Sequence, residues 1–169
     1  MATDDVTIVG GELRIDDLDA FLATIDRVAE RHDVTIQAFD ARYVAGTEHL
    51  ERAVASAERA IANDDAIARD PAVELLLYAA GRRQIERALE MGVDEGTGPA
   101  AIVVTGGDEA GAAEALRREL DLAETAVLDE CDERTVTEFF DIDEAERDTT
   151  DATLAALVRE RVALLAVEK

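Results

Sequence analysis

Short apolar runs alternate with segments of helical periodicity along most of this chain, and that alternation is the strongest constraint on its fold. Strands are predicted over 6–13, 34–44 and 100–107, where the run "AAIVVTGG" is apolar enough for a buried strand. A further strand is predicted around 125–130. Because helices separate these runs, the sequence predicts one helix-rich α/β domain over 1–169 with a small mixed central sheet.

Helical periodicity and residues typical of helix ends predict where the helices lie. Carboxylates at the N-terminus of the first helix and a proline at the start of the third fit the preferences of helix ends. The helices are predicted, in chain order, over 16–32, from a cap at Thr47 to the "NDD" at 63–65, from Pro71 to Gly92 with an interruption at Gly81, over 108–120, and from Glu133 onward with a polar break at 148–151.

The charge balance indicates the salt concentration at which the protein works. Forty acidic residues face 17 basic ones, Lys169 is the only lysine, and the formal net charge is −23. This pattern is typical of a halophilic, archaeal protein from a molar-salt cytoplasm, where carboxylates keep the surface hydrated. At about 1 M salt the Debye length falls to about 3 Å, so the net charge does not exclude an anionic partner.

Composition also narrows the class of protein. A hydrophobic content of 48% excludes wholesale disorder. The sequence has no charged leader followed by an apolar segment and no uncharged apolar stretch of about 20 residues, so we expect a soluble, cytoplasmic protein without membrane contact. The single cysteine, Cys131, excludes an internal disulfide and is expected to be an incidental thiol.

Support for catalytic chemistry in this chain is thin. The stretch "VVTGGDEAG" could place a phosphate at a strand-to-helix turn, but it lacks the G-x-G-x-x-G spacing and a Walker lysine. Asp108 and Glu109 put negative charge there, which favours a plain turn with an aspartate cap. His32 and His49 are not at ligand spacing with each other or with the cysteine. We therefore expect no metal, no cofactor and no enzymatic activity of the chain alone.

Positive charge collects in one segment, "ELLLYAAGRRQIERAL", over residues 74–89. Residues 82–87 carry a net charge of +2 in this strongly acidic chain. If the helix continues through them, Arg83 and Arg87 stand four residues apart on one face and repel each other mildly. This local concentration of arginine requires an explanation.

Two explanations of the arginines stay open at this point. In the first, Arg82 pairs with Glu86 and Arg87 pairs with Glu90 in an ordinary surface salt-bridge ladder. In the second, the guanidinium groups, beside a tyrosine and Gly81, bind backbone phosphates or stack on unpaired bases.

Four blocks of the chain together carry a family resemblance. They are "YVAGTEHLERAVASAERAIAND", "ELLLYAAGRRQIERALEMGV", "AAIVVTGG" and "LVRERVALLAVEK". In this order they resemble the small regulatory, kinase-binding (Cgi-type) subunit of the KEOPS (EKC) complex in its archaeal form. The block "LLYAAGRRQI" is the most specific part, and Arg82 stands where an acid is common in the family.

The resemblance implies a role without a reaction. Such subunits bind and stimulate the small protein kinase/ATPase of KEOPS, contact the other subunits only indirectly, and recruit tRNA by its CCA end for threonylcarbamoyladenosine synthesis next to the anticodon. The chemistry belongs to another subunit. Carried over to this sequence, the resemblance implies tRNA contacts at Arg82, Arg83, Gln84 and Arg87, with Arg42 and Tyr43 as weaker candidates.

The surface for the kinase is expected near the C-terminus. The stretch "LAALVRERVALL" has a wide apolar stripe with Arg161 inside it, and "EFF" supplies Phe139. The candidate partner-binding residues are Leu157, Arg161, Leu164 and Phe139. The alternative is a C-terminal helix docked on the sheet, with Arg161 reaching to solvent and the phenylalanine filling the core.

Two other functions stay open. A small-ligand or nucleotide-binding α/β protein would use the turn from Thr105 to Asp108, and a protein-only scaffold would bind the kinase but no RNA.

Overall fold

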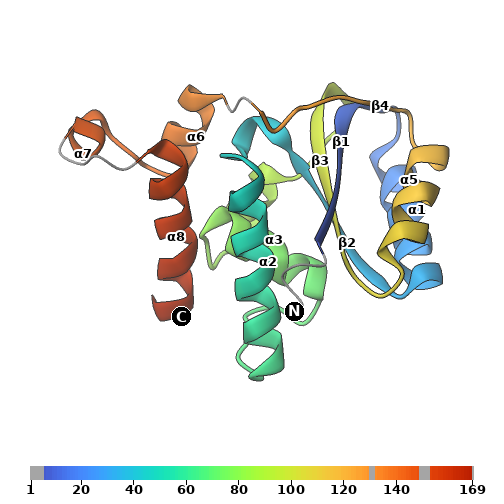
Figure 1. Ribbon diagram of the computed structural model, residues 1–169, viewed down its shortest axis with the longest axis horizontal. Coiled ribbons are helices and arrows are strands. Elements are labelled where there is room, and N and C mark those ends of the chain that lie inside the picture. The colour runs from blue at the N-terminus through green and yellow to red at the C-terminus, as the bar shows by residue number, and fades with distance from the viewer. Residues whose placement is uncertain (1–5, 130–131, 149–152, 169) are drawn as a thin grey trace.

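A computed structural model of the chain describes residues 6–129, 132–148 and 153–168 (Figure 1). Within them four strands form one sheet in the order β2-β3-β1-β4. The strands are β1 (Val6–Ile15), β2 (Val34–Asp40), β3 (Gly96–Gly106) and β4 (Leu122–Glu124). All three strand pairs are antiparallel, so the expectation of an α/β domain with a small central sheet is confirmed, but the sheet is not mixed.

Two long central strands set the register of the sheet. β1 and β3 pair along their whole length, from Val6 opposite Thr105 to Ile15 opposite Gly96. Because side chains alternate between the faces of a strand, Val103 and Thr105 face one layer of helices while Ile102 faces the other.

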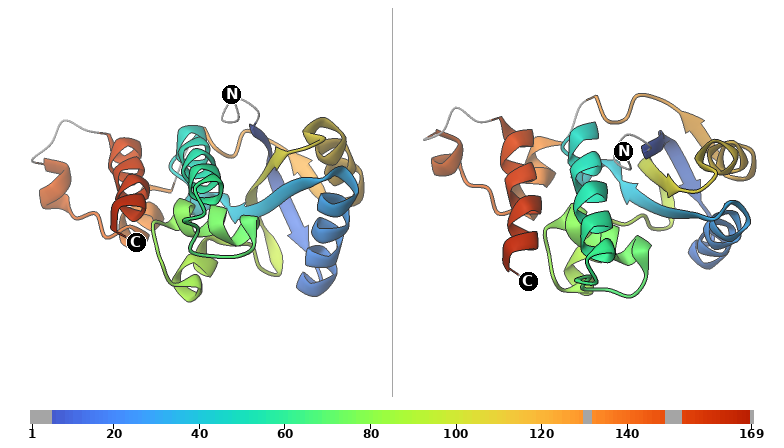
Figure 2. Two further views of the ribbon diagram at one scale, coloured as in Figure 1. Left: turned by 90° about the horizontal axis from the view of Figure 1, so that it is seen from below. Right: turned by 60° about the horizontal axis from the view of Figure 1, so that its bottom comes forward.

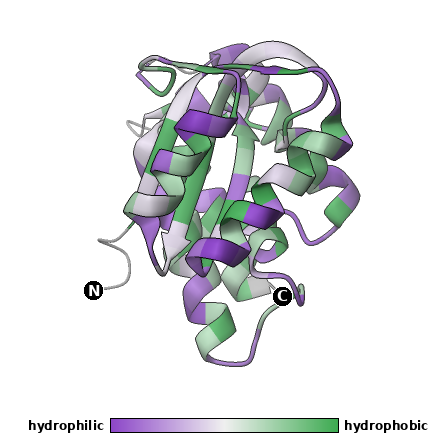
Figure 3. Cartoon of the chain, turned by 90° about the vertical axis from the view of Figure 1, so that its right-hand side faces the viewer, coloured by the Kyte–Doolittle hydropathy of each residue, from purple (hydrophilic) through white to green (hydrophobic). Residues whose placement is uncertain are grey.

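Helices α1 (Leu18–His32) and α5 (Glu109–Glu119) cover one face of the sheet (Figure 1). The side chain of Asp17 caps α1 and that of Asp108 caps α5, as expected for the second of them. Viewed from this side, hydrophilic residues are spread over the outer surface of the helices (Figure 3).

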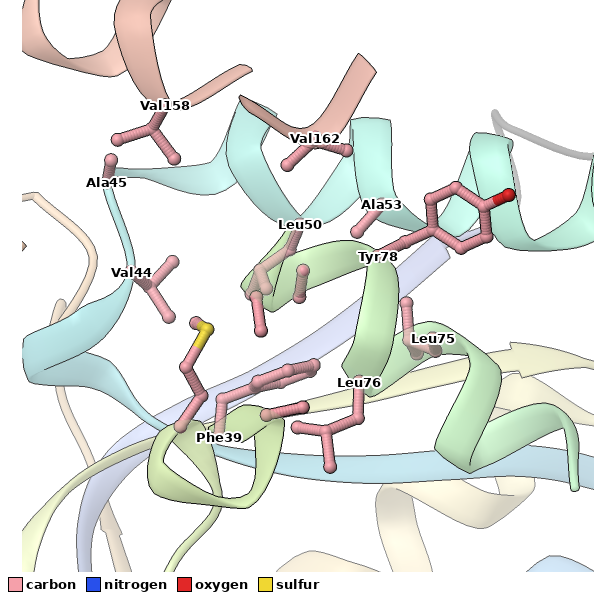
Figure 4. Packing of buried hydrophobic residues seen from close by; sticks show 14 of the residues in the cluster. Phe39, Val44, Ala45, Leu50, Ala53, Leu75, Leu76, Tyr78, Val158 and Val162 are labelled. Carbon is pink, nitrogen blue, oxygen red and sulfur yellow. The ribbon is translucent and has the colours of Figure 1, made fainter. Parts of the chain in front are cut away.

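Helices α2 (Thr47–Ala62) and α3 (Pro71–Ala80) cover the opposite face of the sheet. α8 (Leu154–Glu168) packs on α2 and α3 and lies away from the sheet, as Figures 1 and 2 show. Val158 and Val162 of α8 point toward Ala45, which precedes α2, and Leu50 in the first half of α2 (Figure 4). The alternative in which this helix docks on the sheet is therefore wrong.

The third predicted helix is the main departure from the sequence analysis. α3 begins at Pro71 and is interrupted at Gly81, both as expected. Beyond the interruption, however, only α4 (Ile85–Ala88) and a 3-10 turn at Leu89–Met91 follow. A continuous helix to Gly92 does not form, because Gly81 adopts a left-handed conformation with φ of 61°.

Smaller differences concern the ends of other elements. Gly46 rather than Thr47 occupies the N-cap of α2, and β2 stops at Asp40, where a 3-10 turn begins. The fourth strand, β4, lies before the strand that was predicted around 125–130. It is a three-residue edge strand, and only its pairing with β1 fixes it.

The C-terminal part is helical, as predicted. It contains α6 (Glu133–Phe139) and α7 (Glu144–Asp148) before α8, with a break between α6 and α7 that the periodicity did not indicate. Most of the predicted polar break at 148–151 lies outside the described residues, as does Cys131. Among the described helices, none is long and apolar enough to cross a membrane.

Candidate functional site

The end of α3 determines the direction in which residues 82–87 leave the helix. The N–H groups of Gly81 and Arg82 donate to the carbonyls of Tyr78 and Leu77, which closes the helix. A Cβ on Gly81 would lie 3.2 Å from the Arg161 carbonyl oxygen of α8. Glycine is therefore required both by the left-handed conformation and by the close approach of α8.

Arg82 turns inward from this point. Its guanidinium carbon lies 4.9 Å from the centre of the Phe139 ring, and its Nη2 donates to the Phe139 carbonyl. The Asp141 carboxylate is 3.7 Å away, and Nε is buried without an acceptor among the described residues. Burial and the charge of Arg87 lower the pKa of Arg82. Arg82 thus serves the fold.

Arg161 reaches the same turn from α8. Its Nε donates to the Phe140 carbonyl at 3.2 Å, its Nη2 donates to the Asp141 carbonyl at 3.3 Å, and its two terminal nitrogens hold the Glu146 carboxylate at 2.9 and 2.8 Å. The hydrogen bonds that Arg161 donates to the Glu146 carboxylate raise the pKa of Arg161. Two guanidinium groups therefore occupy the carboxyl end of α6, where a helix favours positive charge.

Phe139 lies at the centre of this cluster. Its buried ring makes edge-on contacts with Tyr43 at 5.4 Å and with Phe140 at 5.0 Å between centroids. The structure thus brings together three predicted site residues, Arg82, Arg161 and Phe139, in an internal contact.

Arg83, Gln84 and Arg87 are exposed and face solvent. The predicted pairs of Arg82 with Glu86 and of Arg87 with Glu90 do not form, and within the described chain neither Arg83 nor Arg87 lies at ion-pair distance from a carboxylate. We call residues 82–87 the basic segment. Beside it lies an open hollow of about 490 Å³, here called the α3 hollow, lined by Ile67, Ala68, Leu77 and residues 83–86.

The buried carboxylate of Glu74 fixes the backbone of the loop that lines the α3 hollow beside the basic segment. Glu74 is 0% exposed, and its two oxygens accept hydrogen bonds from the N–H groups of Ile67 and Ala68 at 3.1 and 2.7 Å. This residue was not predicted from the sequence. The available signal was a glutamate inside the apolar run "ELLLY", where a charged side chain must find buried donors.

Arg42 and Tyr43 lie in a different hollow, of about 570 Å³. Arg42 forms a two-point ion pair with Asp40, with a shortest distance of 2.6 Å, and the hydrogen bonds that Arg42 donates to Asp40 raise the pKa of Arg42. The Tyr43 hydroxyl donates to Glu90 at 3.3 Å, and burial followed by the charge of Glu90 raises the pKa of Tyr43. These two residues thus line a different hollow from Arg83 and Gln84.

The two leucines proposed for the partner surface differ in exposure. Leu157 is 4% exposed and belongs to the core, whereas Leu164 is 44% exposed. Val167, one turn further along α8, is 80% exposed. The C-terminal half of α8 therefore presents an apolar strip to solvent.

The turn between β3 and α5 already uses its backbone donors. Gly106 donates to Glu109, Gly107 to the Asp33 carbonyl at 3.0 Å and Asp108 to the His32 carbonyl at 3.0 Å. The N–H of Gly111 and the ring of His32 lower the pKa of Asp108. A phosphate would have to displace these partners beside two carboxylates, which disfavours a nucleotide site at this turn.

The histidines are likewise engaged. His49 is buried, accepts from the Ala45 N–H at 3.0 Å and donates to the Ala79 carbonyl at 2.7 Å, while His32 pairs with Asp108. In the part of the chain that the structure describes, no group of three or more histidine, cysteine, aspartate or glutamate residues could hold a metal ion.

Comparison with models of protein families identifies a family to which the chain is similar. The family described as kinase binding protein CGI-121 matches residues 17–166 of the chain. No curated protein matches.

Proposed function

Because the chain belongs to the CGI-121 family of kinase-binding proteins, we propose that it is the non-catalytic accessory subunit of a KEOPS complex. In this role it binds and stimulates the small protein kinase/ATPase of the complex. It also recruits tRNA by its CCA end for threonylcarbamoyladenosine synthesis, while the chemistry takes place on another subunit.

The apolar strip on α8 supports a kinase surface at the C-terminal helix. Leu164 is exposed and would contact the partner directly. Leu157 and Phe139 would support that surface from the core, and Arg161 would fix α8 against the end of α6. Burial of a strip of this kind is a usual source of binding free energy at an interface.

The RNA part of the proposal rests on the exposed arginines of the basic segment. Arg83 and Arg87 have no ion pair among the described residues, although the chain offers 40 carboxylates, and Gln84 stands between them beside the α3 hollow. Binding by phosphate pairs alone weakens steeply as salt rises. A single-stranded CCA end offers bases that stack and form hydrogen bonds, so its binding would withstand high salt better.

The test is a gel shift of tRNA by the purified chain in molar KCl. Arg83→Glu is expected to weaken tRNA binding by at least about tenfold without changing the fold, because Arg83 is exposed. Arg31→Glu, an exposed arginine on α1 at the opposite face of the sheet, is the matched control and should bind like the wild type.

If Arg83→Glu and wild type shift tRNA equally, the assignment of this residue is wrong. If the wild type binds the kinase but no tRNA at any salt concentration, the chain is a protein-only scaffold. Thermal stabilisation by a nucleotide would instead favour the small-ligand alternative.

A further inference from the structure

The α3 hollow has two walls, and the two ends of α3 hold them. One wall is the loop that contains Ile67 and Ala68, which binds the Glu74 carboxylate in the first turn of α3. The other wall is the segment 83–86, which follows the end of the helix. Leu77 lines the hollow between them. Because residues three positions apart share a helix face, Glu74 and Leu77 lie on the same side of α3.

The loop between α2 and α3 depends on Glu74 for its position. At its start, the Asp65 N–H donates to the Ala60 carbonyl at 2.8 Å, and at its end the Asp70 side chain caps α3. Residues 66–69, between these ends, form neither helix nor strand. The two hydrogen bonds to Glu74 therefore fix the backbone at the point where it lines the hollow.

A carboxylate is the side chain that suits the two donors of this loop. Each oxygen of Glu74 accepts one backbone N–H, from Ile67 or from Ala68, and the side chain is fully buried. An amide would offer one acceptor and would turn its own N–H₂ group toward the second donor, while an apolar side chain would leave both donors unpaired. Burying a charge is costly, and here the buried charge determines the shape of a hollow that opens to solvent.

We propose that Glu74 is a positioning residue for RNA binding. Through the loop it fixes the apolar wall at Ile67 and Ala68, and an unpaired base of the RNA packs on this wall. Arg83 and Gln84, on the opposite wall, contact the same end of the RNA. Glu74 itself does not touch the RNA, because its side chain is buried. The proposal rests on the proposed recruitment of tRNA by its CCA end.

The salt concentration makes the apolar wall important. Ion pairs between arginine and phosphate weaken steeply as salt rises, whereas packing of a base on an apolar surface does not depend on counterion release. In molar KCl, the position of the wall should therefore affect the affinity for an unpaired RNA end more than the affinity for the paired stem.

The test compares Glu74→Gln with the wild type in molar KCl, at a temperature where both proteins are folded. Amide hydrogen exchange of Ile67 and Ala68 should be faster in the variant, because one donor loses its acceptor. In a gel shift, intact tRNA should bind the variant at least about fivefold more weakly. The same tRNA lacking CCA should bind both proteins equally, since the wall contacts only the unpaired end.

Asp70→Ala is the matched control, because it also removes one negative charge close to the loop. It removes the cap of α3 and should lower the melting temperature by about 2 to 4 °C. The hydrogen bonds to Glu74 stay in place in this variant. Its affinity for intact tRNA should therefore stay within a factor of about two of the wild type.

Other results would overturn the proposal. Unchanged exchange at Ile67 and Ala68 in Glu74→Gln would show that the loop does not depend on Glu74. Unchanged or tighter binding of intact tRNA would show that the loop is not part of the RNA site. Equal losses for Glu74→Gln and Asp70→Ala, or for tRNA with and without CCA, would show a general effect on stability. If the wild type itself does not shift intact tRNA, the proposed function fails together with this role of Glu74.

Discussion

Arg82 and Arg83 are neighbours in the chain, but their guanidinium groups have different surroundings. Arg82 lies on the Phe139 ring and donates to a carbonyl at the end of α6, whereas Arg83 is exposed beside the α3 hollow. The left-handed Gly81 produces this divergence, because it ends the helix immediately before the two arginines. A charge reversal at Arg82 would therefore disturb the fold, and only one at Arg83 is a clean test of RNA contact.

His49 predicts how the stability of the protein depends on pH. Burial lowers the pKa of His49 from 6.5 to about 4, and its Nδ1 already accepts the Ala45 N–H, so a proton has no favourable site. The unfolded chain takes up that proton below pH 6.5. The contribution of His49 to stability is thus complete above the unfolded pKa and is lost as the pH falls toward the folded value.

The measurement is urea unfolding at several pH values. Between about pH 7 and pH 4 we expect His49 to account for a loss of about 3 kcal/mol in the free energy of unfolding. His49→Gln should unfold more easily at neutral pH but should lack this part of the slope. Equal slopes for His49→Gln and wild type would contradict this role, and His32→Gln, at a half-buried histidine outside the core, provides the comparison.

At the scale of elements, the contact between the end of α3 and α8 is the critical one. Gly81→Ala would place a Cβ in a left-handed conformation and 3.2 Å from the Arg161 carbonyl. We expect a loss of about 2 kcal/mol in the free energy of unfolding, together with weaker tRNA binding, because the turn that presents Arg83 shifts.

Gly98→Ala is the matched control for this glycine. Gly98 has no positive φ, and a Cβ there would meet nothing within 4 Å. The two variants therefore differ in conformation and space rather than in chemistry. Equal stability of Gly81→Ala and Gly98→Ala, measured by urea unfolding, would contradict the structural role of Gly81.

The elements also show which parts of the fold could be predicted from the sequence. The strand at 100–107 and the helix at 16–32 were predicted nearly correctly because long apolar periodicity and an aspartate cap mark them locally. The edge strand β4 and the docking of α8 on α2 were not, because each depends on a partner distant in sequence. The end of α3 was marked by Gly81, but its effect on the arginines requires the three-dimensional turn.

At the scale of the whole molecule, two hollows draw on residues that no local pattern connects. The α3 hollow combines the basic segment with a loop that Glu74 holds in place, and a smaller hollow of about 80 Å³ combines α2 with β3 through Glu58 and Thr105. Glu58 could not be singled out from the sequence, because it is one of 40 acidic residues. Only the burial of its Oε1 and its single hydrogen bond distinguish it from a hydrated surface carboxylate.

Above all, we propose that one chain joins the kinase to the CCA end of tRNA. The most direct measurement is the affinity of the chain, in complex with the kinase and in molar KCl, for intact tRNA and for the same tRNA lacking CCA. We predict that the complex binds intact tRNA and that removal of CCA weakens binding by at least about tenfold, since the unpaired bases supply the contacts that survive salt. Equal affinity for the two tRNAs would contradict the account.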